Sequence, residues 1–200
     1  MDLDFFYDFV CPYAYLASTG VEALAARTGA RLVWRPFLLG GVFRALGTAD
    51  DPNRALHPAR ARYNLLDMHR WAEHRAVPFR MPPGHPRRTV LALRAALAAG
   101  DATLPAASQA IYRAYWAEGR DVEDPAVVAG ALSAAGLDGP ALVARAPDLK
   151  DELFRRTGEA VAAGVFGAPA FVVAGQLFWG QDRMDFAEAA LLAHRKGIGS

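Results

Sequence analysis

The chain has 200 residues, of which 53% are hydrophobic and 10% aromatic, and a formal net charge of +1. This composition is typical of an ordered globular protein and excludes a disordered chain. The sequence gives no support for nucleic-acid binding, because no basic run is interleaved with aromatic residues and no zinc-finger spacing occurs. No apolar stretch has the length needed to span a membrane.

The chain starts Met1-Asp2-Leu3-Asp4, which lacks the basic segment and the cleavage site of a signal peptide. It contains a single cysteine, Cys11, so no internal disulfide can form. We therefore expect a reduced, cytoplasmic protein.

The first third of the chain alternates between strand and helix patterns. Residues 3–10 are aromatic and β-branched, which is typical of a short buried strand, and a helix is predicted over residues 14–27. Residues 31–37 predict a second strand, parallel to the first because a helix connects the two. Residues 38–58, with several Gly, Asp and Pro residues, are expected to form a loop.

Helical patterns then continue until strands return near the C-terminus. The predicted helices cover residues 59–76, 87–99, 104–118, 124–135, 138–146 and 147–163. Residues 170–174 and 176–179 flank Gly175 and predict an antiparallel pair of strands. A last helix is predicted over residues 183–196, with Asp182 as its N-cap.

Without its central helical block, the chain has the element order β-α-β-α-β-β-α, which is the order of the thioredoxin fold. We therefore predict an α/β protein in which residues 1–37 and 148–200 form a thioredoxin-like domain. Residues 38–147 would form a large all-helical insertion domain. The thioredoxin fold places the start of its first helix at the active site, and we expect the site in the cleft between the two domains.

Cys11 lies at the predicted start of the first helix. It is followed by Pro12, which suits the first helical position because that position needs no N–H. Free N–H groups and the positive end of the helix dipole favour a thiolate, or a bound anion, at this place. A redox protein would carry a second cysteine three residues on, where this chain has Ala14. The alternative is a buried, inert cysteine.

Two later segments could also bind a ligand. Pro169 stands at the entry to a strand after the small residue Ala168, which, with the element order, predicts a cis Ala168-Pro169 bond. The backbone N–H and C=O of Ala168 would then be exposed and could pair with an extended peptide. Gln181 and Asp182 precede the last helix, where a carboxylate could hold a ligand's ammonium group. Asp182 could equally serve only as an N-cap.

The remaining chemistry-bearing residues predict no further site. The histidines form no HExxH motif and no metal-like pair with a carboxylate, so we expect no metal site. Four aromatic residues on predicted helices are expected in the core or an interface, although some could line a substrate pocket: Trp71, Tyr112, Tyr115 and Trp116.

These segments together resemble a known family. The chain is similar to the 2-hydroxychromene-2-carboxylate isomerases and to the closely related kappa-class glutathione transferases, which belong to the thioredoxin-like superfamily that includes the DsbA-type oxidoreductases. The resemblance spans essentially the whole chain. It rests on residues 8–17, 60–63, 67, 70–71, 77–79, 164–169 and 179–183.

The resemblance implies a glutathione site around Cys11. In the family a serine usually fills this position and hydrogen-bonds the glutathione sulfur, and Pro12 and Tyr13 follow in the contact region. The backbone of Ala168, before cis Pro169, would pair with the cysteinyl part of glutathione.

The resemblance assigns the two ends of glutathione to other residues. Gln181 and Asp182 match the family positions that bind the γ-glutamyl end. A family lysine that meets the glycine carboxylate corresponds to Arg60, which keeps the charge but changes the geometry. A family asparagine falls near Thr48.

The implied activity is that of a glutathione-dependent isomerase acting on an aromatic-derived small molecule such as 2-hydroxychromene-2-carboxylate. Cys11 would stabilise the glutathione thiolate, and the resemblance implies a homodimer. Because a cysteine replaces the family serine, a kappa-like transferase or a single-cysteine thiol-disulfide oxidoreductase is an alternative. A non-catalytic module that binds a thiol or an extended peptide is an alternative of another class.

Overall fold

The central sheet confirms the predicted α/β class. The computed structural model describes residues 1–48 and 56–197, and within them the sheet has four strands in the order β2-β1-β3-β4. The strands are β1 (Asp2–Tyr7), β2 (Arg31–Pro36), β3 (Ala170–Val173) and β4 (Gln176–Trp179). β1 and β2 are parallel, and β3 and β4 are antiparallel, as the sequence predicts. β3 also pairs with β1, in the antiparallel direction.

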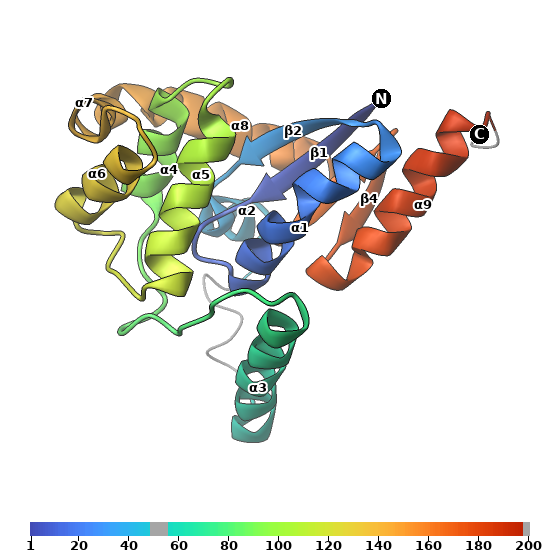
Figure 1. The fold of residues 1–200 in the computed structure, drawn as a ribbon, viewed down its shortest axis with the longest axis horizontal. Coiled ribbons are helices and arrows are strands. Elements are labelled where there is room, and N and C mark those ends of the chain that lie inside the picture. Colours follow the sequence, from blue (N-terminus) through green and yellow to red (C-terminus); the bar gives the residue numbers. More distant parts are fainter. Residues whose placement is uncertain (49–55, 198–200) are drawn as a thin grey trace.

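Helices surround this sheet and form a block beside it (Figure 1). They are α1 (Pro12–Thr28), α2 (Leu39–Ala45), α3 (Pro58–His74), α4 (Val90–Ala98), α5 (Leu104–Tyr112), α6 (Pro125–Ala134), α7 (Gly139–Arg145), α8 (Lys150–Ala162) and α9 (Met184–Arg195). A π-helical turn, η2 (Arg113–Ala117), continues α5, and 3-10 turns η3 (Ala146–Leu149) and η4 (Gln181–Arg183) precede α8 and α9. No helix in the described part of the chain is both long and apolar enough to cross a membrane.

The side chains of β1 alternate between two hydrophobic clusters. Leu3, Phe5 and Tyr7 are fully buried in the larger cluster, which includes residues of α1, α9 and α4 to α7. Phe6 points to the other face and packs in a smaller cluster with residues of α2 and α8. Strand alternation thus divides the core between the two faces of the sheet. Because the larger cluster continues into the helical block, the division into domains at residues 37/38 and 147/148 stays a prediction.

Helix α2 corrects the prediction of a loop over residues 38–58. The N–H of Leu39 donates to Asp8 Oδ2 (2.8 Å), and the N–H of Leu38 donates to Thr157 Oγ1 (3.0 Å). Gly41 faces Thr157 so closely that a Cβ would lie 2.9 Å from its methyl carbon. Distant groups therefore satisfy the first N–H groups of α2, and a glycine allows α2 to approach α8, which outweighs the poor helix propensity of glycine.

The start of α4 also differs from the predicted helix over residues 87–99. The N–H of Arg87 donates to Tyr115 Oη (3.1 Å) and that of Arg88 to Glu123 Oε1 (2.6 Å). Thr89 is the N-cap residue but makes no side-chain cap; its hydroxyl donates to Asp8 Oδ1 instead. These tertiary contacts hold residues 87–89 outside the helix.

The carboxylate of Asp8 thus joins three segments that are distant in sequence. It is 1% exposed. Oδ1 accepts hydrogen bonds from the N–H of Val10 (3.2 Å) and from Thr89 Oγ1 (2.5 Å), while Oδ2 accepts from Leu39. Burial raises the pKa of this carboxyl group, and the hydrogen bonds from Thr89 and the backbone oppose that rise. The loop that leads from β1 to Cys11 is anchored by this carboxylate.

We predict that Thr89→Val lowers the free energy of unfolding by about 1–3 kcal/mol, because one donor to the buried carboxylate is lost. The loss should grow between pH 4 and pH 7. The pKa of Asp8 is higher in the folded protein than its value of about 3.9 in the unfolded protein, so folding becomes less favourable as the pH rises above that value. Removal of the Thr89 hydroxyl raises the folded pKa of Asp8 further, which increases the loss at high pH. Urea unfolding at both pH values measures this.

Thr19→Val is the matched control, since the hydroxyl of Thr19 donates only to Leu16 O in its own helix. It should change stability little and equally at both pH values. An equal loss for Thr89→Val at pH 4 and pH 7 would contradict the assigned role of the Asp8 carboxylate.

Candidate active site

Cys11 is the N-cap residue of α1, and Pro12 occupies the first turn, as predicted. The backbone of Cys11 is extended, with φ −90° and ψ 115°, and its carbonyl accepts from the N–H groups of Ala14 and Tyr15. The thiol does not cap the helix. Instead, Sγ donates to the main-chain oxygen of Ala168 at 3.0 Å, which joins the first helix to the segment before β3.

The thiol of Cys11 is a hydrogen-bond donor rather than a thiolate. It is 8% exposed, and burial raises its pKa to about 12. The N–H groups of Ala14 and Tyr13 lower the pKa, as the helix N-terminus predicts, but their effect is smaller than that of burial, and the charge of Asp8 adds to the rise. Of the two alternatives that the sequence leaves open, the structure of the ligand-free protein therefore favours a buried cysteine over a thiolate.

The Ala168-Pro169 peptide bond is cis, which confirms the prediction. The sequence predicts that both the N–H and the C=O of Ala168 are free. The C=O is not, because it already accepts a hydrogen bond from Cys11. Its N–H has no partner within residues 1–48 and 56–197. A carbonyl oxygen has two lone pairs, so Ala168 can still offer one acceptor and one donor to an extended ligand.

Gln181 and Asp182 lie close in space to the cis-proline segment. The main-chain oxygen of Pro169 accepts from the N–H of Gly180 at 2.9 Å, which places the turn η4 beside the cis-proline. Gln181 is 3% exposed, whereas the side chain of Asp182 is about half exposed. The predicted pair of residues therefore lies next to the Cys11–Ala168 contact.

Asp182 is not the N-cap of the last helix, which corrects that prediction. The N-cap of α9 is Arg183, and it makes no side-chain cap. Gly180 has φ 112°, which suits glycine, and a Cβ there would lie 2.5 Å from Asp182 Oδ1. The chain therefore turns at η4 before α9 begins, and Asp182 Oδ2 accepts instead from Arg183 Nη1 at 2.5 Å.

Tyr13 connects these residues to helix α3. Its side chain is partly buried, and its pKa is raised to about 12, first by burial and then by nearby acidic groups. Those groups are Asp67, Cys11, Asp182 and Tyr63, in decreasing order of effect. Tyr13 thus lies within electrostatic range of Cys11 and Asp182, and α3 contributes Asp67, which sequence reasoning did not assign to the site.

Thr48 and Arg60 are not brought together with the other predicted residues. Thr48 is exposed beyond the end of α2, and its hydroxyl donates to Phe43 O at 3.1 Å. Arg60 is exposed in the first turn of α3, which projects from the body of the molecule (Figure 1). That turn is about 20 Å along the helix axis from the end of α3 that contacts Gln181, at 1.5 Å per residue. Their contacts with a ligand stay predictions.

The buried aromatic residues of α5 and η2 belong to the core, as expected. Tyr112, Tyr115 and Trp116 are fully buried. The indole N–H of Trp116 donates to Phe9 O at 2.8 Å, and the Tyr112 hydroxyl lies 3.4 Å from Asp8 O. They therefore support the loop that carries Cys11 from the side of the helical block.

Sequence reasoning missed Arg75, which binds Gln181. Its Nη2 donates to Gln181 Oε1 at 2.9 Å. The two residues are 106 positions apart, so no local pattern could reveal the pair. Within the described residues no cluster of three His, Cys, Asp or Glu side chains could hold a metal ion.

Comparison with known proteins agrees with this fold. The family model of the DSBA-like thioredoxin domain matches residues 2–192. A 2-hydroxychromene-2-carboxylate isomerase from Sphingobium xenophagum is 34% identical over 192 residues, which cover 95% of this chain and 97% of the relative. Glutathione S-transferase kappa 1 from Homo sapiens is 26% identical over 215 residues, covering 98% of this chain and 90% of the relative.

A solved structure shows the same arrangement. It is that of a 2-hydroxychromene-2-carboxylate isomerase, which matches with a TM-score of 0.86 and 25% identity and covers 100% of both chains. The chain therefore belongs to the DSBA-like thioredoxin domain family and, within it, to the 2-hydroxychromene-2-carboxylate isomerase family.

We predict that Cys11 reacts slowly with iodoacetamide in the folded protein, because alkylation requires the thiolate and the pKa of Cys11 is about 12. At pH 8 the rate should be at least about tenfold below that of an ordinary thiol with a pKa of about 8.5. Mass spectrometry of samples in which the alkylation has been quenched at successive times measures this rate. The urea-unfolded protein is the control and should react like a free cysteine, whereas a midpoint of the rate below pH 9 in the folded protein would contradict the burial argument.

Proposed function

We propose that the protein is a glutathione-dependent isomerase that acts on an aromatic-derived substrate such as 2-hydroxychromene-2-carboxylate. The observation that carries the proposal is the hydrogen bond from Cys11 to Ala168 O at the cis-proline. It puts a thiol donor, at the start of a helix, beside a main-chain N–H that has no partner among the described residues. The names of the relatives support an isomerase, and the kappa-class relative supports the use of glutathione.

The groups around Cys11 fit glutathione in chemical type. The N–H and C=O of Ala168 match the peptide groups on either side of the cysteinyl residue, as in an added β-strand. Gln181 and Asp182 offer an amide and a carboxylate for the γ-glutamyl end. The thiol of Cys11 and the first N–H groups of α1 would face the glutathione sulfur, where positive potential favours a thiolate.

Glutathione would supply a thiolate that adds reversibly to the substrate, permits rotation or ring opening, and is then expelled. The role of Cys11 in this scheme is to remain neutral and donate a hydrogen bond to that sulfur, because its own pKa is about 12. The approach of the glutathione sulfur would turn the S–H of Cys11 away from Ala168 O. The Ala168 carbonyl would then accept from the ligand backbone instead.

A single-cysteine thiol-disulfide oxidoreductase is the second candidate, and the same geometry disfavours it. Attack on a disulfide needs a thiolate, and burial holds Cys11 in its neutral form. Ala14 also removes the resolving cysteine of a two-cysteine exchange. A kappa-like transferase would use the same glutathione site and differ only in its second substrate, and a non-catalytic module would bind the thiol without turnover.

Oligomeric state, location and domain organisation are properties of the whole protein. We propose a homodimer, supported by the exposed apolar side chains of Tyr63, Leu65 and Leu66 on the projecting helix α3 (Figure 1). We also propose a cytoplasmic location, and a thioredoxin-like domain divided by a helical insertion over residues 38–147.

The proposal predicts isomerisation of 2-hydroxychromene-2-carboxylate that depends on added glutathione. Cys11→Ser should retain activity, because a hydroxyl is a better donor than a thiol. Cys11→Ala should lower kcat by about 10²-fold, because the bound glutathione sulfur loses a donor, so less of it is thiolate before addition and it is a poorer leaving group when it is expelled. Absorbance of the substrate, followed with and without glutathione, measures both.

The two variants control for each other, since each changes one side chain at the same place, and equal melting temperatures would show that both are folded. Activity that glutathione does not affect would overturn the proposed cofactor. Reduction of a glutathione mixed disulfide that depends on Cys11 and is lost in Cys11→Ser would favour the oxidoreductase. Binding of glutathione without turnover of any substrate would favour the non-catalytic module.

A further inference from the structure

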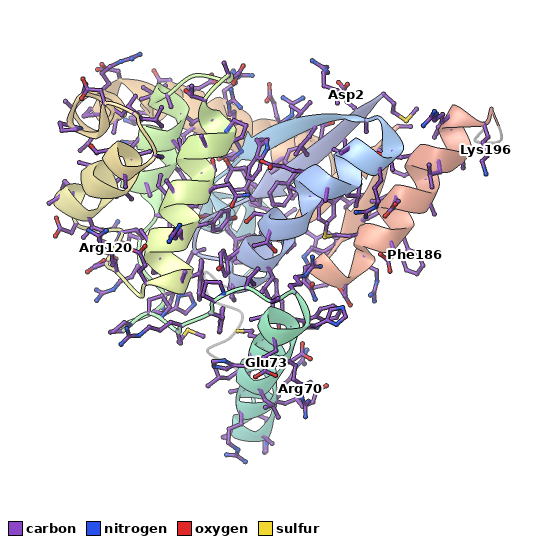
Figure 2. All side chains as sticks on the ribbon, viewed as in Figure 1. Asp2, Arg70, Glu73, Arg120, Phe186 and Lys196 are labelled. Carbon is purple, nitrogen blue, oxygen red and sulfur yellow. The ribbon has the colours of Figure 1, made fainter. Side chains whose placement is uncertain are left out.

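The guanidinium group of Arg75 lies directly behind Gln181. Arg75 follows the last residue of α3, and its Nη2 donates both to Gln181 Oε1 (2.9 Å) and to the main-chain oxygen of Gln181 (3.2 Å). Arg70 and Glu73 of α3 are exposed to solvent (Figure 2), whereas Arg75 is partly buried. The end of α3 is therefore joined to the turn that precedes α9.

Neighbouring groups hold Arg75 in this position. Its guanidinium carbon lies 5.8 Å from the centroid of the Trp71 ring, and Nη2 is 3.5 Å from Met184 Sδ. Nη1 lies over Gly20 of α1, where a Cβ would be only 2.7 Å away. Three elements, α1, α3 and α9, thus contribute to one pocket for the guanidinium group.

The contact with Arg75 determines which way the Gln181 amide faces. An arginine side chain has only donors, so the atom of Gln181 at 2.9 Å must be the amide oxygen. The Nε2 group then points away from Arg75, and it has no hydrogen-bond partner within residues 1–48 and 56–197. Gln181 therefore has its two amide donors on the side away from Arg75.

The charge of Arg75 is not neutralised locally. Among the described residues no carboxylate lies within ion-pair distance of its guanidinium, and its Nε is buried without a partner. Burial lowers the pKa of Arg75, which shows that its charge is held at a cost in solvation, offset only in part by the charge of Asp185. The positive potential of Arg75 favours an anion next to Gln181.

We propose that Arg75 is a positioning residue that holds Gln181 with its amide N–H groups toward the ligand, so that the site selects a ligand with a carboxylate at its γ-glutamyl end. Asp182, with a half-exposed carboxylate beside Gln181, then meets the ammonium group of the same end. This inference rests on the proposed function and adds to it the residue that makes the site discriminate between thiols.

The test is direct binding by titration calorimetry with glutathione and two analogues of its γ-glutamyl end. One is 4-aminobutyryl-Cys-Gly, which lacks the α-carboxylate, and the other is glutaryl-Cys-Gly, which lacks the α-amino group. Gln181→Glu keeps the acceptor for Arg75 but replaces the outward N–H groups by a carboxylate oxygen. It should weaken binding of glutathione and of the glutaryl analogue at least about tenfold, and that of the 4-aminobutyryl analogue less than about twofold.

Arg75→Met, which keeps much of the side-chain volume, should show the same selectivity, because the Gln181 amide is then free to rotate. Arg75→Lys should recover part of it, since the ammonium group can still donate to Oε1. Arg70→Met is the matched control on the exposed face of α3 and should leave all three affinities unchanged. Melting temperatures of all variants show which are folded.

Equal weakening of all three ligands by Gln181→Glu or by Arg75→Met, or no change for any of them with either variant, would overturn the role of Arg75 while leaving the glutathione site in place. Failure of the unaltered protein to bind glutathione would overturn the proposed function and this inference together.

Discussion

One buried carboxylate, that of Asp8, holds together the parts of the molecule that make the site. It accepts from its own loop at Val10, from the first turn of α2 at Leu39, and from Thr89 before α4. These groups come from the end of β1, from the segment after β2 and from the helical block. Because a buried carboxylate is costly without such donors, the loop between β1 and α1 can take only the path that satisfies it. That path brings Cys11 against Ala168, where the cis-proline segment enters the sheet.

The chemistry at Cys11 follows from a competition between two effects on its pKa. The N–H groups at the start of α1 favour the thiolate, and burial disfavours it more strongly. The thiol therefore stays neutral and bonds to a main-chain carbonyl. A neutral donor suits a partner that brings its own thiolate, and it does not suit a residue that must itself attack a disulfide. By the same reasoning a serine could fill this position as well as a cysteine, since both side chains donate one hydrogen bond.

Local sequence patterns predict the strands, most helices and the position of Cys11, because each depends on residues within a few positions of one another. The cis Pro169 is predicted only when the element order of the whole chain is added. Local patterns do not predict features that depend on contacts between distant residues. Helix α2 forms over Gly40-Gly41 because Asp8 and Thr157 bond its first N–H groups. The pKa of Cys11 depends on burial by the whole fold. Arg75 could not be assigned at all, because its partner Gln181 lies 106 positions away. Asp182 is not the N-cap that the sequence pattern predicts, because the chain forms the 3-10 turn η4 before α9 begins.

The most direct test of the central claim is a crystal structure of the protein with glutathione. We predict that the glutathione sulfur lies within hydrogen-bond distance of Cys11 Sγ, with the cysteinyl backbone paired to Ala168 and the γ-glutamyl carboxylate on the amide of Gln181. Glutathione bound elsewhere, a disulfide between Cys11 and glutathione, or an unchanged hydrogen bond from Cys11 to Ala168 with no ligand beside it would contradict the account.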